Sequence, residues 1–142
     1  SAKWLTLKKY HGNSDNTPQC LSGLKKSGYL LVAATPHKDD YSPETLPLDQ
    51  KIALMFGTEL EGLTPSAISQ ADAFIRIPMF GFTESLNISV SAAILMQSLS
   101  SRIRSSGVSW ELGSDEKNEL LLEWLKRSVK NSGKILDHPR NL

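Results

Sequence analysis

The sequence predicts an α/β fold in which a mainly parallel sheet is flanked by helices. Two continuous apolar runs of strand length, 29–35 and 52–56, carry this prediction, because an unbroken apolar run is typical of a strand covered on both faces. Helical patterns alternate with these runs along the chain, and buried strands that alternate with helices favour parallel pairing. With 142 residues and 39% hydrophobic content, the chain has the size of one domain with a real core.

The elements can be placed in order along the chain. We expect strands at 4–9, 29–35, 52–56 and 74–78. We expect helices at about 17–27, 65–71, 86–104 and 114–132. The polar segment 37–49 is predicted to be a loop, and 131–142 a tail.

Local signals mark most of the helix ends. Thr17 before Pro18, and Thr64 before Pro65, each place a capping hydroxyl ahead of a residue that favours the first helical turn. Gly28 follows the first helix as a C-terminal cap. Ser114 is a candidate cap for the last helix.

The helix predicted for 86–104 is unusual in its composition. Small residues crowd its first half, so another backbone could approach it closely, and we expect it to be buried nearly all round. The turn before it, at 78–87, is rich in Pro, Gly, Thr, Ser and Asn, and its backbone looks suited to contact a ligand.

Composition excludes several classes of protein. The formal net charge of +1 indicates no global field for nucleic acid, and no apolar run is long enough to span a membrane. A single cysteine, Cys20, and the lack of a signal peptide fit a cytoplasmic protein. The three histidines have no metal-ligand spacing, so we expect no metal.

Three predicted strands end in loops that could form one pocket. Ligands of open α/β sheets collect at the carboxyl ends of the strands, and here those ends are 34–36, 57–62 and 77–87. Gly57 and Gly62 let the second loop bend and let a ligand approach its backbone. No GxGxxG or GxxxxGK[ST] motif is present, which disfavours a nucleotide held through its phosphates. A backbone-lined apolar pocket would suit a flat ring such as adenine.

Several of these residues also have purely structural interpretations, and the pattern alone leaves both open. Ser85 and Asn87 could be simple helix caps. Glu59 and Glu61 could be solvated turn residues, and Met79 and Phe80 could belong to the core.

Two segments, ALMFGTELEGL (53–63) and IPMFGFTESLNISVSAA (77–93), resemble the second and third signature motifs of the SpoU (TrmH-like) RNA ribose 2′-O-methyltransferases. The resemblance implies the SPOUT α/β-knot fold, in which the chain around 85–90 threads through a loop to form a C-terminal trefoil knot, a rare exception among folds. It also implies a homodimer whose last core helices pack together.

The resemblance further implies an enzyme of the EC 2.1.1 class that transfers a methyl group from S-adenosyl-L-methionine to a ribose 2′-hydroxyl of tRNA or rRNA. The cofactor-binding residues would then be Thr35, Gly57, Glu59, Ile77, Met79, Ser85 and Leu86. The catalytic residues would be Asn87, Ser85 and Glu59, with Arg102 and Arg104 as RNA-binding residues.

The family's opening motif, an Asn and an Arg before this region, is not found in the chain. We therefore expect residues 1–142 to be a single SpoU methyltransferase domain that is N-terminally incomplete, with a core at about 1–106 and a helix at about 114–132. Such a chain would bind the cofactor better than it catalyses. The alternative is a non-catalytic knotted dimer that binds S-adenosylmethionine or RNA without turnover.

Overall fold

The structure is a computed structural model that describes residues 4–12, 16–130 and 132. It divides into two compact units: residues 10–109 form one, and the parts of the chain before and after them form the other. Among the described residues, no helix is long and apolar enough to cross a membrane.

The unit 10–109 is built on a three-stranded parallel sheet. Its strands are β1 (Tyr29–Ala34), β2 (Lys51–Met55) and β3 (Ala73–Ile75), in the spatial order β2-β1-β3. In the register, Leu31 lies beside Ala53 and Ala33 beside Phe74. The predicted parallel α/β fold is thus confirmed, and β1 is the central strand.

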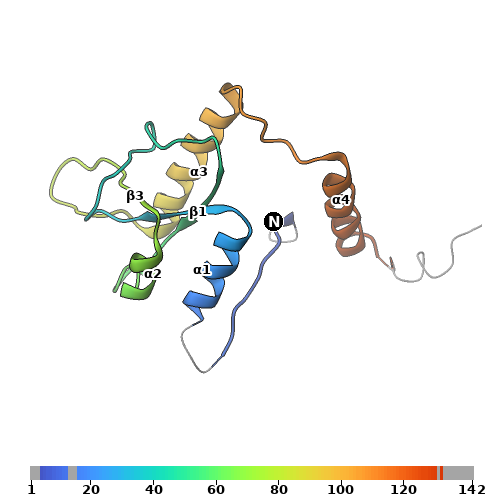
Figure 1. Ribbon diagram of the computed structural model, residues 1–142, viewed down its shortest axis with the longest axis horizontal. Helices are drawn as coiled ribbons and strands as arrows, with labels where there is room; N and C mark the ends of the chain where they lie inside the picture. Colours follow the sequence, from blue (N-terminus) through green and yellow to red (C-terminus); the bar gives the residue numbers. More distant parts are fainter. Residues whose placement is uncertain (1–3, 13–15, 131, 133–142) are drawn as a thin grey trace, which may run out of the picture. The chain divides into compact units, whose positions relative to one another are not determined.

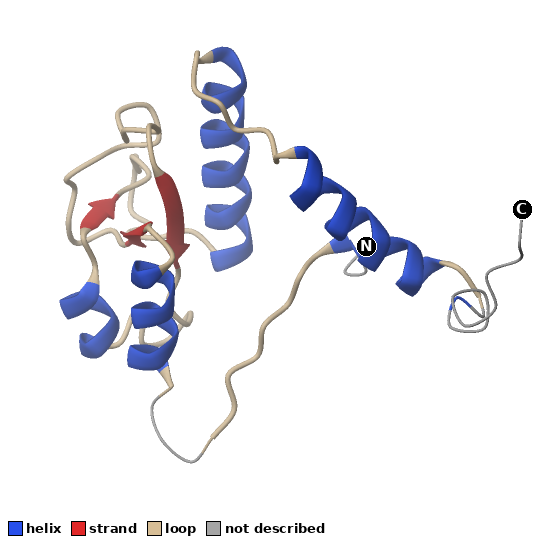
Figure 2. Ribbon diagram, turned by 45° about the vertical axis from the view of Figure 1, so that its right-hand side comes forward, coloured by secondary structure: helices blue, strands red, loops and turns tan. Residues whose placement is uncertain are grey.

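Helices cover both faces of this sheet. The helices of the unit are α1 (Thr17–Lys26), α2 (Pro65–Gln70) and α3 (Ile88–Ser105). Figure 2 shows the strands between α1 and α2 on one side and α3 on the other. Alternate residues of β1 feed two cores: Leu31 and Ala33 pack towards α1 and α2, and Val32 packs towards α3.

The helix ends follow the expected signals in part. The hydroxyl of Thr64 accepts a hydrogen bond from the backbone N–H of Ala67 at 3.2 Å, which caps α2 as predicted. Gly28 has a positive φ of 79° just after α1. At the other end of α1, Thr17 is already helical and Asn16 takes the cap position, so the predicted cap is one residue too late.

A short segment of the loop after β1 is paired with the outer edge of β3, as the loop beside the sheet in Figure 1 illustrates. The backbone N–H of Tyr41 donates to the carbonyl of Phe74, and that of Arg76 donates to the carbonyl of Tyr41, both at 3.0 Å. The Asp40 carboxylate accepts from the backbone N–H of Phe74 at 2.9 Å, and Asp39 pairs with Arg76 at 2.7 Å. These bonds fix the segment at the edge of the sheet.

Some predicted boundaries are wrong. Residues 4–9 form no strand: Trp4, Leu5 and Leu7 are largely exposed, and no described strand runs beside them. β3 ends at Ile75 rather than 78, and α3 starts at Ile88 rather than 86, so the connecting loop is longer than expected. Helix α3 is not buried all round in the single chain, because only one face meets the sheet, through Leu95 and Leu99.

The other unit contains α4 (Ser114–Ser128) and the described residues near the N-terminus. Ser114 is the first helical residue of α4 and Gly113 takes the cap position. The rings of Trp4 and Trp124 meet edge to face with centroids 5.5 Å apart, and Arg127 donates to the carbonyl of Leu5 at 3.3 Å. Of the predicted tail, Ser132 is described, and 131 and 133–142 lie outside the described residues.

Candidate functional site

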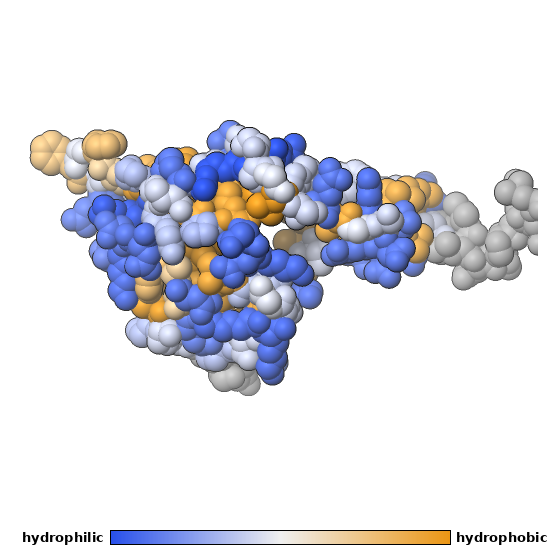
Figure 3. Space-filling model, turned by 45° about the horizontal axis from the view of Figure 1, so that its top comes forward, coloured by the Kyte–Doolittle hydropathy of each residue, from blue (hydrophilic) through white to orange (hydrophobic). Residues whose placement is uncertain are grey.

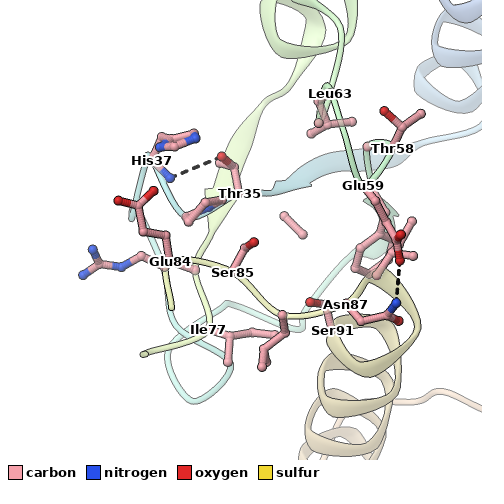
Figure 4. A pocket seen from close by; sticks show the side chains of 18 of the residues that line it. Thr35, His37, Thr58, Glu59, Leu63, Ile77, Glu84, Ser85, Asn87 and Ser91 are labelled. Atoms are coloured by element: carbon pink, nitrogen blue, oxygen red, sulfur yellow. Dashed lines mark hydrogen bonds between the residues drawn. The ribbon is translucent and has the colours of Figure 1, made fainter. Parts of the chain in front are cut away.

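A pocket of about 650 Å³ lies at the carboxyl ends of the three strands. Its walls come from the three loops that follow β1, β2 and β3, and from the first turn of α3. Figure 4 shows these loops converging from different sides on one cavity. A volume of this size falls within the range of about 300–1,000 Å³ that is usual for small-molecule and cofactor sites.

The wall after β2 is a tight turn that depends on two glycines. Thr58 and Gly62 exchange two backbone hydrogen bonds of 3.0 Å, and the hydroxyl of Thr58 accepts from the N–H of Glu61 at 3.1 Å. Gly62 has a φ of 66°, a conformation that favours glycine. Gly57 is required for a different reason: a Cβ there would lie 1.9 Å from the backbone carbon of Gly62.

A hydrogen bond between two predicted site residues joins this turn to α3. The side-chain amide of Asn87 donates to the carboxylate of Glu59, and its oxygen accepts from the backbone N–H of Ser89 at 2.8 Å. Both ends of the Asn87 amide are therefore engaged, one at the pocket wall and one as the N-terminal cap of α3. The capping role left open above is confirmed, and it coexists with a position in the pocket.

Ser85 does not cap α3, since it lies three residues before the helix, and it lines the pocket instead. Met79 is half-buried and also lines the pocket. Phe80 is fully exposed, so its interpretation as a core residue is wrong. In Figure 3 the loop that carries it lies at the left edge, where apolar orange surface reaches solvent.

The structure brings most of the predicted site residues together. The pocket is lined by Thr35, Gly57, Glu59, Ile77, Met79, Ser85, Leu86 and Asn87. Arg102 and Arg104 do not line it. Arg102 donates instead to the backbone carbonyl of Pro43 at 2.7 Å and lines a second, smaller hollow.

The carboxylate of Glu44 lies in the same turn as that carbonyl. A hydrogen bond of 2.7 Å from the Ser42 hydroxyl lowers the pKa of Glu44, and its own backbone N–H and the positive charge of Arg102 act in the same direction. Arg102 thus contributes to the packing of the loop 42–45 against α3.

Four ionisable residues of the pocket, His37, Glu61, Arg76 and Glu84, were not among the predicted site residues, although Glu61 was weighed as a turn residue. The backbone N–H of His37 donates to the hydroxyl of Thr35 at 3.3 Å, and Figure 4 shows Glu84 near His37 at one end of the cavity. His37 and Glu84 could have been found from their places in the predicted strand-end loops. Arg76 had no such signal, because it lies within the segment predicted as strand.

The pocket combines apolar walls with a few polar groups, an arrangement that binds a mixed apolar and charged ligand. Ile77, Met79 and Leu63 supply apolar surface, and Glu59 supplies a carboxylate. Among the described residues, no group of three His, Cys, Asp or Glu side chains could hold a metal ion.

Comparison with known proteins agrees with this geometry. Residues 1–97 match the profile of the SpoU rRNA Methylase family. The chain is 40% identical over 92% of its length to a tRNA (guanosine(18)-2′-O)-methyltransferase of Borreliella burgdorferi, and covers 58% of that protein. It is 29% identical over 91% of its length to the enzyme of the same name in Aquifex aeolicus, and covers 60% of it.

Two solved structures have related folds. The A. aeolicus TrmH/SpoU tRNA modifying enzyme matches 82% of this chain with a TM-score of 0.67 and 28% identity, over 61% of its own length. The SpoU methyltransferase AviRb from Streptomyces viridochromogenes, in complex with the cofactor AdoMet, matches 64% of this chain with a TM-score of 0.52 and 26% identity, over 35% of its own length. The chain therefore spans about three fifths of the relatives named first. The matched family profile covers both motif segments, 53–63 and 77–93. The chain belongs to the SpoU rRNA methylase family.

Proposed function

We propose that this chain is the cofactor-binding part of an S-adenosylmethionine-dependent methyltransferase that acts on a ribose 2′-hydroxyl of tRNA or rRNA. One observation carries the proposal: eight predicted residues line the same pocket. They were predicted from two separate motifs and from the end of β1. The relatives named tRNA 2′-O-methyltransferases and the AdoMet complex of AviRb support it.

The residues present fit the proposed cofactor. Ile77, Met79 and Leu86 offer apolar surface for an adenine ring, and Gly57 keeps side-chain bulk out of the turn facing the cavity. Glu59 offers a negative charge to a cationic sulfonium group. S-adenosylmethionine, when bound, would supply the methyl group for transfer to the hydroxyl oxygen.

The catalytic contribution of this chain would be mainly positional. Alignment of two reacting groups can lower a barrier by about 7–11 kcal/mol without further chemistry. Asn87 is oriented by its bonds to Glu59 and Ser89, so it is held in place before any substrate arrives. We propose that Asn87 and Ser85 position the ribose and that Glu59 orients Asn87.

We also propose that the chain forms the trefoil knot and the homodimer of its family. The exposed apolar residues of α3 support the dimer: Ile88, Val90, Ile94 and Met96 lie outside the core of the single chain. A second copy of α3 would cover them. Arg102 and Arg104, in the last turn of α3, remain our proposed RNA contacts. We expect this activity in the cytoplasm.

Calorimetric titration of the 142-residue chain with S-adenosylhomocysteine tests the cofactor site. We expect saturable binding of one ligand per chain, and a folded chain that binds none would refute the proposed pocket. Transfer of labelled methyl groups to unmodified tRNA transcripts then tests turnover. Cofactor binding without transfer by this chain would favour the non-catalytic binding module instead.

A further inference from the structure

We infer that the rings of Phe80 and Phe82 form a platform on which bases of the substrate RNA stack. This inference rests on the proposed function, since it assigns a role in binding the same RNA. The first observation is exposure: Phe80 is 93% exposed and Phe82 is 106% exposed. No other described aromatic residue of the chain is exposed by more than half.

The backbone explains why the two rings stay outside the core. Gly81 lies between them with a φ of 109°, a conformation that residues with a side chain rarely adopt. The chain therefore turns sharply at the one position between the rings. Neither ring belongs to either core cluster.

The position of this loop points to the ligand. The residues just before and after the two rings, Met79 and Glu84 to Asn87, line the pocket at the strand ends. A ribose that presents its 2′-hydroxyl to that pocket carries a base one glycosidic bond away. The base, or its neighbour in the strand, must then lie close to the loop that bears the rings.

The chemistry of the rings matches this ligand. Single-stranded and splayed RNA bases stack on exposed aromatic side chains, largely without regard to base identity. Two rings with open faces at the rim of a ribose site suit such stacking. The apolar side chains proposed for the dimer surface of α3 differ in chemistry, since Ile88, Val90, Ile94 and Met96 carry no ring on which a base could stack.

The test compares substitutions that separate ring stacking from apolar burial. Phe80→Leu and Phe82→Leu keep an apolar side chain but remove the ring, whereas Phe80→Tyr and Phe82→Tyr keep the ring. We expect each leucine variant to bind an unmodified tRNA transcript about 10-fold more weakly in a filter-binding assay, and each tyrosine variant to bind it like the wild type. Leu7→Ala, another exposed apolar position, is the control and should leave RNA affinity unchanged.

Two further measurements on the same variants separate this inference from the proposed function. S-adenosylhomocysteine affinity by calorimetry and mass by light scattering should stay at wild-type values in all four Phe variants. Leucine variants that bind RNA normally, a loss of dimer mass, or a wild-type chain without RNA affinity would each overturn the stacking platform. Failure of the wild-type chain to bind S-adenosylhomocysteine would refute the proposed pocket. This result tests the proposed function and does not depend on the rings of Phe80 and Phe82.

Discussion

Replacing Gly57 by alanine should destabilise the unit 10–109 more than any other single added methyl group in its pocket turn. The new Cβ would lie 1.9 Å from the backbone carbon of Gly62, 2.1 Å from the nitrogen of Leu63 and 2.2 Å from the carbonyl oxygen of Gly62. All three are backbone atoms held by the paired hydrogen bonds between Thr58 and Gly62. The turn can make room only by opening.

The expected magnitude follows from the kind of atom that must move. Forcing one extra methylene into a packed region commonly costs about 1–3 kcal/mol, when flexible side chains can give way. Here rigid backbone must retreat by more than ~1 Å and two hydrogen bonds of the turn are strained with it, so we expect Gly57→Ala to cost at least about 3 kcal/mol.

Two matched glycine substitutions calibrate this expectation. Gly62 has a φ of 66° but open space around a Cβ, so Gly62→Ala should cost only about 1–2 kcal/mol, from backbone strain. Gly23 is an exposed residue of α1 with nothing within 4 Å of an added Cβ, so Gly23→Ala should stabilise the chain by as much as about 0.8 kcal/mol. The same added methyl group is therefore expected to destabilise the chain strongly at Gly57, to destabilise it less at Gly62 and to stabilise it at Gly23.

The assay is urea unfolding followed by far-UV circular dichroism. Tryptophan fluorescence would be misleading, because Trp4, Trp110 and Trp124 all lie outside the unit that carries the substitutions. A Gly57→Ala variant as stable as Gly62→Ala would refute the close backbone approach of the turn.

Three other predictions address the site, an ion pair and the dimer. Asn87→Ala should lose the α3 cap, at about 1 kcal/mol, leave the fold intact and lower methyl transfer to RNA, whereas Asn87→Asp keeps the cap oxygen but repels Glu59. Transfer by the Asp variant at the wild-type rate would remove the contact between Asn87 and Glu59 from the mechanism. Partial burial raises the pKa of Asp72, but hydrogen bonds, including one of 2.6 Å from Lys25, and the charge of Lys25 outweigh it and lower the pKa below 3.8. The Asp72 carboxylate therefore stabilises the fold above pH 3.8, and this stabilisation is lost as the pH falls through the lowered pKa. Its size is small, because both groups of the ion pair are partly exposed. If the free energy of unfolding of the wild type and of Asp72→Asn changed in parallel with falling pH, the prediction would be wrong. Ala93→Glu would bury an unpaired charge if α3 packs against a second copy, so light scattering should report monomers, and an intact dimer would place the interface elsewhere.

Local patterns predicted the parts of the fold that local physics determines. The unbroken apolar runs gave β1 and β2 within about one residue at each end, since such runs are stable only when covered on both faces. Thr64 before Pro65 predicted the cap of α2 correctly, because the cap bond joins residues three positions apart. The predicted strand at 4–9 failed for the opposite reason: a strand needs a neighbouring strand, which a local pattern cannot supply.

The candidate site was predictable as a set of loops and less so as a set of contacts. That the three strand ends meet follows from parallel pairing, which sequence alternation already indicated. The bond from Asn87 to Glu59 spans 28 residues, and the bond from Arg102 to the carbonyl of Pro43 spans 59, so neither leaves a spacing signal in the sequence. Arg102 was predicted from a motif as an RNA contact, and its backbone partner became visible only in three dimensions.

The segment 39–41 that is bonded along β3 also determines where this sheet could grow. A free strand edge is a template for another chain, and the bonds of Tyr41 and Asp40 already occupy the outer backbone groups of β3. Among the described strands, β2 then has a neighbour on one side only. Association of copies through strand pairing, including misfolded association at high concentration, would therefore begin at Lys51–Met55 and not at the strand that leads into the pocket.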